Sequence, residues 1–288
     1  WLGRQELRPL VVAAGQKLDN RFGLFRHDSF VGRALGAKVF SEKGRGWLLL
    51  LPATPELWAA ALPLRTQIIQ ALDRAVVTAE LHIRPGQKVL ESGTGSGAMS
   101  LSLLRALGSK GKLLTFEYNQ SRADAARKDF EALGMQERVD VFCRNVCQDG
   151  FLCDAVEATS VDALFLDLPR PQDALQSAAE VLKPNGRLGS YSPCIEQVMA
   201  TCDGLRALGF HSIRTIEARE KVFEPSRLDF IDLEGAAAQQ REGVQRRPRA
   251  PLPMATRLCA KAVPGMRGHT AYLTFAYAPL TPLGDAAS

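Results

Sequence analysis

Long apolar runs are absent from this sequence of 288 residues. Its longest run of large apolar side chains covers only residues 47–51, whereas a membrane-spanning helix needs about 18 or more consecutive apolar residues. We therefore expect no transmembrane helix and no membrane partner.

Cysteine and histidine are scarce and lack the spacing of metal ligands. The six cysteines form no Cys-x-x-Cys pair, and the four histidines are not spaced as ligand pairs. We expect neither a metal site nor a disulfide framework. The thiols are predicted to be reduced, as in a cytosolic or nuclear protein.

Composition excludes the non-globular classes. With 46% hydrophobic and 23% charged residues, the chain resembles neither a disordered protein nor a collagen-like or coiled-coil rod. Its length suits one large domain with a small appendage. The net charge of +5, with basic residues concentrated between positions 241 and 267, leaves room for an acidic partner.

The N-terminal part reads as a small β module. Between residues 22 and 51, short apolar runs alternate with glycine-containing turns, a pattern typical of short antiparallel strands. Pro52, Pro55 and Pro63 mark the boundary of this module, which we place at residues 1–60. A helical pattern over residues 66–81 follows.

From residue 88 onward, apolar strands alternate with helices. Helices between strands require crossover connections, so we predict a mostly parallel, doubly wound α/β sheet within residues 61–288. The periodicity is lost over residues 230–265, which we interpret as a flexible insertion. Residues 269–276 then predict a last strand at or near the sheet edge.

The strongest local motif is a strand that runs into a glycine-rich turn and a helix. It reads Glu-Ser-Gly-Thr-Gly-Ser-Gly over residues 91–97. Such a turn lets a ligand approach the backbone, and the helix N-terminus offers free N–H groups to a nucleotide-like ligand. A dinucleotide fingerprint would have glycine where this chain has Ala98, although a nicotinamide or flavin cofactor and a ligand-free glycine turn both stay possible readings.

Three polar residues lie at the ends of successive predicted strands. Glu117 ends the second strand, where a carboxylate accepts hydrogen bonds from both ribose hydroxyls or, alternatively, is a solvated strand-end carboxylate. Asn145 follows the third strand and either accepts a hydrogen bond from an adenine amine or shapes a turn, with Val146 beside it to pack on the adenine face. Asp167 follows the fourth strand, where it either faces a ligand in the crevice or is a buried structural cap.

The loops beside Asp167 add weaker signals. Proline keeps Leu168 extended in Asp-Leu-Pro-Arg-Pro, so we expect a rigid loop. The loop lacks the aromatic residue of the Asn/Asp-Pro-Pro-aromatic motif found in enzymes that methylate exocyclic amines. Cys194 has no neighbouring base in the sequence, so we interpret it as a small packing residue rather than a nucleophile.

Taken together, these motifs resemble the catalytic subunit of the eukaryotic tRNA (adenine-58-N1)-methyltransferase, a class I S-adenosylmethionine-dependent enzyme. The resemblance covers residues 22–276 apart from the insertion, and its motifs lie at residues 55–58, 62–68, 91–97, 165–169, 192–198 and 268–270. It implies a Rossmann-like methyltransferase sheet with a small N-terminal β-barrel-like module. It further implies S-adenosyl-L-methionine as cofactor, tRNA as substrate, a nuclear location with the cytoplasm as a second compartment, and a tetramer. That tetramer pairs two copies with two of a non-catalytic paralogous subunit, or is a homotetramer.

The resemblance also assigns roles to individual residues. The implied cofactor-binding residues are Gln67, Ile69, Glu91, Gly93, Thr94, Gly95, Ser96, Gly97, Ala98, Glu117, Arg122, Asn145, Val146 and Asp167. The implied substrate-binding residues are Arg65, Pro169, Ser192, Pro193, Gln197, His269 and Thr270. The family commonly has Asp at the position of Asn145. Asp167 is the predicted catalytic residue, because it can accept a hydrogen bond from N6 of adenine while N1 attacks the sulfonium methyl group.

Two alternative functions remain at this stage. One is methyl transfer to another RNA or to a small molecule, which the N-terminal module and the additional motifs disfavour. The other is a non-catalytic tRNA-binding paralogue, which would be free to lose the glycine turn and Asp167, both present here.

Overall fold

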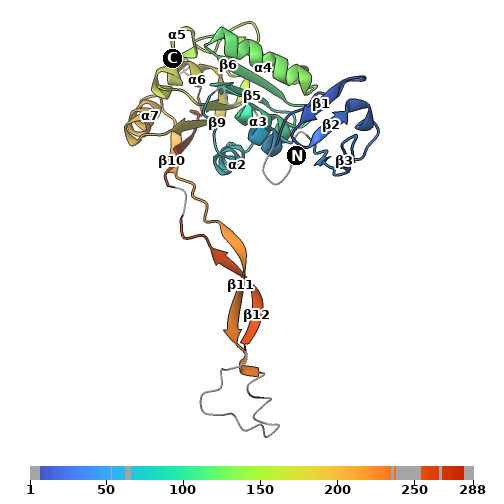
Figure 1. The fold of residues 1–288 in the computed structure, drawn as a ribbon. Helices are drawn as coiled ribbons and strands as arrows, with labels where there is room; N and C mark the ends of the chain where they lie inside the picture. Colours follow the sequence, from blue (N-terminus) through green and yellow to red (C-terminus); the bar gives the residue numbers. More distant parts are fainter. Residues whose placement is uncertain are drawn as a thin grey trace. The chain divides into compact units, whose positions relative to one another are not determined.

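A computed structural model of the chain describes residues 7–52, 54–61, 66–234, 237, 254–265 and 268–281. The described residues fall into two units (Figure 1). The first unit includes the chain up to Ala218 and again from Thr270, and the second lies between them, from Arg219 to His269.

A seven-stranded sheet forms the centre of the first unit, in the order β10-β13-β9-β8-β5-β6-β7. Its strands are β5 (Lys88–Ser92), β6 (Lys112–Glu117), β7 (Val139–Cys143), β8 (Val161–Leu166), β9 (Leu182–Ser192), β10 (His211–Ile216) and β13 (Tyr272–Tyr277). The five strands β5 to β9 pair in parallel, whereas β13 is antiparallel to both β9 and β10. The predicted doubly wound sheet is confirmed, and the predicted last strand lies next to the edge strand β10.

Helices cover both faces of this sheet (Figure 1). One layer contains α2 (Ala71–Glu80), α3 (Ala98–Leu107) and α4 (Gln120–Ala132), and the other contains α5 (Val146–Asp149), η2 (Pro171–Ala174), α6 (Leu175–Val181) and α7 (Ile195–Ala207). Because side chains alternate along a strand, Val89 packs into the first layer and Leu90 into the second. Two buried apolar clusters result, one on each face.

The order of the strands places a crevice in this sheet. β5 pairs with β6 on one side and with β8 on the other. The connection that follows β5 therefore leads to one side of the sheet, and the later strands β8 and β9 lie on the other side. In open parallel sheets, ligands bind outside the carboxyl ends of the strands at such a reversal. The residues that follow β5, β6, β7 and β8 therefore meet at one edge.

The N-terminal part forms the predicted β module, as two antiparallel hairpins. These are β1 (Lys17–Asn20) with β2 (Gly23–Arg26), and β3 (Lys38–Phe40) with β4 (Trp47–Leu49), and the short helices are η1 (His27–Ser29) and α1 (Pro55–Ala61). The described strands form two separate ladders rather than one closed barrel. Phe25, Phe30, Val39 and Leu48 form one shared core between them.

The helix predicted over residues 66–81 begins only at Ala71. Residues 66–70 are not helical, because tertiary hydrogen bonds hold them over the crevice instead, as described below. Tertiary contacts have here overridden a helical pattern that is correct for the following ten residues.

The predicted flexible insertion over residues 230–265 contains paired strand residues at 230–231 and 254–262, while residues 235–236 and 238–253 lie outside the described residues. β11 (Phe223–Ile231) pairs along its whole length with β12 (Met254–Ala262) as a regular antiparallel hairpin. The sequence signal was misleading because both faces of this hairpin carry exposed side chains, so no strand-like alternation of apolar and polar residues is present. Among the described helices, none is long and apolar enough to span a membrane.

Candidate active site

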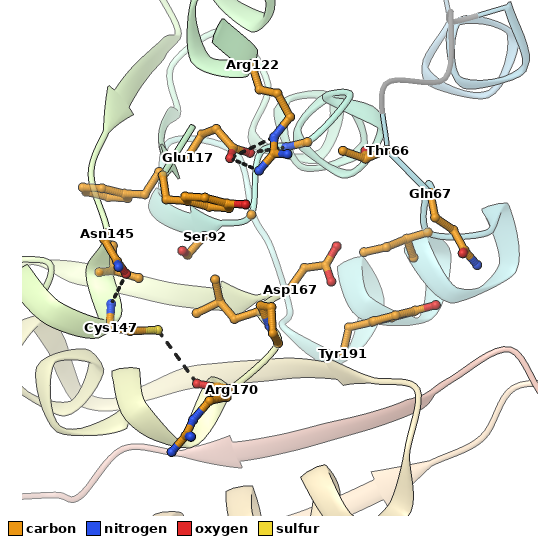
Figure 2. Close-up of a pocket in the computed structure, with 18 of the residues that line it drawn as sticks. Thr66, Gln67, Ser92, Glu117, Arg122, Asn145, Cys147, Asp167, Arg170 and Tyr191 are labelled. Carbon is orange, nitrogen blue, oxygen red and sulfur yellow. Dashed lines mark hydrogen bonds and ion pairs between the residues drawn. The ribbon is translucent and has the colours of Figure 1, made fainter. Parts of the chain in front are cut away.

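A cavity of about 770 Å³ lies at the carboxyl ends of the central strands. Residues after β5, β6, β7, β8 and β9 line it, together with residues 66–69 from the segment before α2 (Figure 2). Its position is the crevice that the strand order predicts, and its size suits a nucleoside-sized ligand.

Two glycines shape the floor of this cavity. Gly93 has φ 97°, and a Cβ atom there would lie 2.2 Å from the carbonyl oxygen of Asp167. Gly95 has φ 53°, and its Cβ atom would lie 2.8 Å from the hydroxyl of Thr66. Only glycine fits both the backbone conformation and the close approach of the neighbouring chain.

Glu117 holds a carboxylate at the end of β6. One of its oxygens accepts a hydrogen bond from the Gly95 N–H at 3.1 Å, and the other accepts from the Asn119 N–H at 3.1 Å. That second oxygen also accepts from Arg122 Nη2 at 2.7 Å (Figure 2). The side chain is only 3% exposed. These bonds fix a negative charge where the fold places ribose hydroxyls, with acceptor capacity left on the carboxylate.

Asn145 caps the short helix α5. Its side-chain oxygen accepts a hydrogen bond from the Cys147 N–H at 3.2 Å (Figure 2). The turn-shaping alternative for Asn145 is thus correct, while its side chain still lines the cavity. An Asp side chain can accept the same hydrogen bond as a helix cap. Asn in place of the family's common Asp therefore leaves the local backbone intact.

Asp167 faces the cavity at the end of β8. Burial, followed by the charge of Glu117, raises the pKa of its carboxyl to about 6. Its backbone N–H donates to the Ser92 carbonyl at 2.8 Å, but no described residue makes a hydrogen bond or ion pair to its carboxylate. The carboxylate is therefore available to a ligand.

Tyr191 lies beside Asp167 (Figure 2). Burial and then the charge of Asp167 raise the pKa of its hydroxyl to about 12, so the ring remains neutral. The hydroxyl donates to the Thr270 carbonyl at 3.5 Å. The aromatic ring thus forms a flat, neutral wall next to an acidic acceptor.

Most of the predicted site residues meet in this cavity. Of the predicted cofactor-binding residues, it is lined by Gln67, Ile69, Gly93, Gly95, Glu117, Arg122, Asn145, Val146 and Asp167. Of the predicted substrate-binding residues, it is lined by Pro169, Pro193, Gln197 and Thr270. Gln197 Nε2 donates to the Pro169 carbonyl at 2.8 Å, so helix α7 supports the loop after Asp167.

The remaining predicted residues are not among those that line the cavity. Thr94, Ser96, Gly97, Ala98 and Ser192 are buried behind it. His269 belongs to the second unit and is exposed. Arg65 lies outside the described residues.

Glu91 also points away from the cavity and is not among the residues that line it. It shares the face of Val89 in β5, where it is fully buried and accepts hydrogen bonds from Ser100 of α3 at 2.5 Å and Thr115 of β6 at 2.8 Å. Burial raises the pKa of its carboxyl to about 8. The alternation of side chains along a strand could have shown this orientation. Glu91 is two positions after Val89 in β5 and therefore faces the same layer of helices, the one that contains α3.

Sequence reasoning missed several lining residues, namely Thr66, Ile68, Ser92, Phe116, Tyr118, Arg144, Cys147, Leu168, Arg170, Asp173 and Tyr191. Phe116, Tyr118 and Tyr191 carried a usable signal, since they are aromatic residues at or next to the carboxyl ends of predicted strands. The prediction for Cys194 is wrong, because its side chain is exposed rather than packed.

Comparison with known proteins decides the family. The model of the family described as "tRNA methyltransferase complex GCD14 subunit" matches residues 46–278 of this chain. The chain belongs to the GCD14 family.

A relative agrees with this placement in the GCD14 family, and solved structures agree with the fold. The chain is 35% identical to the tRNA (adenine(58)-N(1))-methyltransferase catalytic subunit of Dictyostelium discoideum, over 95% of this chain and 92% of that protein. A SAM-dependent O-methyltransferase from Thermotoga maritima superposes with a TM-score of 0.70 at 27% identity, over 93% of this chain and 87% of that one. The tRNA (m1A58) methyltransferase TrmI of Aquifex aeolicus has the same fold, with a TM-score of 0.65 at 21% identity, over 92% and 90% of the two chains.

S-adenosylmethionine is the cofactor of this GCD14-family chain, and the residues present fit it. The turn lines the cavity with Gly93 and Gly95, where a Cβ atom would collide with Asp167 and Thr66. Glu117 offers a fixed acceptor for ribose, and Val146 and Phe116 offer apolar surface for adenine. Residues 66–69 close the opposite wall.

Proposed function

We propose that this chain transfers a methyl group from S-adenosylmethionine to N1 of adenine-58 in tRNA. The observation that carries the proposal is the buried carboxylate of Asp167, which faces the cofactor cavity with no described hydrogen-bonding partner of its own. The membership in a family of tRNA methyltransferase complex subunits supplies the substrate class, and the name of the 35% identical relative supplies the base and the atom.

Asp167 suits the acceptor adenine by charge and by position. Methylation at N1 places a positive charge on a neutral base, and a nearby carboxylate stabilises that charge as it develops. A carboxylate also accepts a hydrogen bond from the exocyclic N6 amine, which orients N1 toward the methyl group. Asp167 therefore both orients the base and stabilises the transition state.

Tyr191 and the loop after Asp167 complete the acceptor side. The neutral ring of Tyr191 offers a face on which the flipped adenine can stack, since the base must leave its own stack to enter the cavity. Gln197 holds the Pro169 carbonyl at 2.8 Å and so fixes the loop at the rim. Pro193 and Thr270 line the same side.

The cofactor side is built to bind rather than to react. S-adenosylmethionine supplies an electrophilic sulfonium methyl group when it is bound. Glu117 orients the ribose, the backbone at Gly93 and Gly95 contacts the amino-acid end, and Asn145 with Val146 contacts the adenine. The rate of methyl transfer then depends on the position of the adenine N1 relative to the methyl group and on the charge of Asp167.

Phosphate contacts should supply most of the affinity for tRNA, and these weaken with salt. Arg170 lies at the rim of the cavity with a side chain that is 71% exposed, although it pairs with Asp173 in the free chain. Arg65 and His269 are further candidates from the sequence. Each is expected to lower tRNA affinity when it is replaced, without an effect on cofactor affinity.

The assembly we propose pairs two copies of this chain with two copies of a non-catalytic paralogous subunit, or four copies of this chain. The second unit supports an assembly, because its hairpin exposes Phe223 (56%), Met254 (58%) and Leu258 (75%). An isolated two-stranded hairpin is marginally stable in water, and exposed apolar side chains mark interaction surfaces. The location we propose is the nucleus, with the cytoplasm as a second compartment, and the six cysteines, which are all free, fit it.

Methyl transfer from labelled S-adenosylmethionine to unmodified tRNA tests the proposal. The chain is assayed alone and with a candidate paralogous subunit, and the product nucleoside is identified. N1-methyladenosine at position 58 is the expected product, and its appearance only with the partner would establish the two-subunit assembly. A different methylated nucleoside, or none despite cofactor binding, would overturn the proposed substrate.

A further inference from the structure

The non-helical segment of residues 66–70, which we call the strap, passes over the glycine turn. Thr66 and Ile69 line the cofactor cavity, and so do the two residues between them. The sequence pattern favours helix here, as in the residues that follow. Side chains outside the strap must therefore hold it in its observed conformation.

Ser96 holds the first end of the strap. The backbone N–H of Thr66 donates to Ser96 Oγ at 3.3 Å, and the two hydroxyl oxygens lie 3.1 Å apart. Ser96 belongs to the glycine turn but is buried and does not line the cavity. Gly95 leaves the space that this contact needs, because a Cβ atom there would lie 2.8 Å from the Thr66 hydroxyl.

Arg74 holds the other end. Its guanidinium is buried, donating from Nη1 to the Ile69 carbonyl at 2.5 Å and from Nε to Ser102 Oγ of α3 at 3.2 Å. Side chains in the first turn of a helix lean toward its N-terminus, which lets Arg74 of α2 reach back to Ile69. One charged group thus ties the strap to the helix that carries the glycine turn.

We infer that Arg74 and Ser96 are positioning residues that hold the strap against the glycine turn and thereby preform one wall of the cofactor site. The inference rests on the proposed function only in that the wall serves S-adenosylmethionine. Neither residue touches the cavity itself, so both act through the strap. Burying a guanidinium is costly unless it is fully hydrogen-bonded, and the strap carbonyl is one of its partners.

The first experiment replaces Arg74 by Lys and by Met in the full chain with its partner subunit. Arg127→Met is the matched control, because Arg127 of α4 also donates to a backbone carbonyl, that of Val141 in β7, but does not line the cavity. We expect the Arg74 variants to raise the Kd of S-adenosylmethionine and S-adenosylhomocysteine, measured by calorimetry, by about tenfold or more. The control and the tRNA affinity should change less than about twofold.

Hydrogen exchange in the absence of cofactor gives a readout independent of activity. The amides of the strap should exchange faster in the Arg74 variants, while those of β5 and β6 keep their protection. Unchanged strap exchange and an unchanged cofactor Kd would overturn the inference. Failure of the wild-type protein to bind S-adenosylmethionine would instead overturn the proposed function.

A second set of variants remains informative even if the Arg74 variants fail to fold. Thr66→Val, Ser96→Ala and the double variant form a cycle for the other end of the strap. If Ser96 acts through Thr66, the double variant should bind the cofactor no more weakly than Ser96→Ala alone. A raised cofactor Kd in Ser96→Ala with unchanged amide exchange in the strap would show that Ser96 contacts the cofactor directly and would overturn its positioning role, whereas Thr66→Val alone keeps the Thr66 N–H bond to Ser96.

Discussion

Asp167 carries a carboxyl whose pKa is raised to about 6, first by burial and then by the charge of Glu117. Its ionised form is the one that stabilises a cationic product. The rate of methyl transfer should therefore rise as the pH increases from 5 to 7, with a midpoint near 6. A single-turnover pH profile with saturating S-adenosylmethionine measures this.

Asp167→Asn should remove this rise and lower turnover by about 10²- to 10⁴-fold, because the amide accepts a hydrogen bond but carries no charge. The Kd of the cofactor, measured alongside, should stay within about threefold of the wild type. A variant that retained the wild-type pH profile would rule out Asp167 as the titrating group.

Glu91 predicts a dependence of stability on pH. Burial raises its pKa from 4.5 to about 8, so the folded chain keeps a proton that the unfolded chain releases in between. The free energy of unfolding should fall as the pH rises through this window, by at most about 1.4 kcal/mol per pH unit.

Glu91→Gln imitates the protonated form and should lose this dependence. The Tm of the variant should decline less than that of the wild type between pH 5.5 and pH 8, measured by thermal unfolding. Glu131→Gln, at an exposed position, is the control and should follow the wild type. Parallel curves for the Glu91 variant and the wild type would contradict the prediction.

At the scale of elements, the glycine turn joins β5 and α3 under the loop that follows β8. Gly93→Ala should destabilise the fold through backbone strain and through collision with the Asp167 carbonyl, 2.2 Å from the new Cβ atom. Gly86→Ala is the matched control, because Gly86 also has a positive φ, 87°, but nothing within 4 Å of its Cβ position.

The control should lose roughly 1–3 kcal/mol of unfolding free energy from strain alone. Gly93→Ala should lose about 1–3 kcal/mol more, because backbone atoms must move. Denaturant titration of both variants measures the difference. Equal losses of unfolding free energy in the two variants would mean that the loop after β8 moves aside without an energetic penalty.

The sequence predicts most of the central sheet because its strands alternate with helices and end in polar residues. Gly93, Glu117 and Asp167 are found where the alternation places them, at adjoining strand ends. The strap could not be predicted, because its conformation depends on Arg74 and Ser96, whose partners come from tertiary packing.

The hairpin of β11 and β12 escaped prediction for a different reason. A strand is recognised by one buried face, and this hairpin buries neither face within the described residues. Its pairing is regular over nine residues in each strand all the same. A hairpin without a buried face leaves no alternation of apolar and polar residues in the sequence.

For the whole molecule, the exposed side chains of this hairpin predict an effect on assembly. Phe223→Glu combined with Leu258→Glu should weaken association with the partner, because charged side chains resist burial in an apolar interface. Light scattering after size exclusion should show smaller species at micromolar concentration. Cofactor affinity, which the first unit determines, should persist, and intact assembly would contradict this role of the hairpin.

The strands β10 and β13 flank the hairpin in the sequence and are neighbours in the sheet, with Ile216 opposite Leu273. The sheet thus holds together the two points between which the second unit is inserted. Loop-closure entropy rises only slowly with length, so a longer or shorter segment here costs the sheet little. This junction is therefore a place where evolution or an engineer can exchange the inserted unit at little cost to the sheet. It lies at the same sheet edge as the cavity, because Leu273 pairs with Tyr191 and both Tyr191 and Thr270 line the cavity.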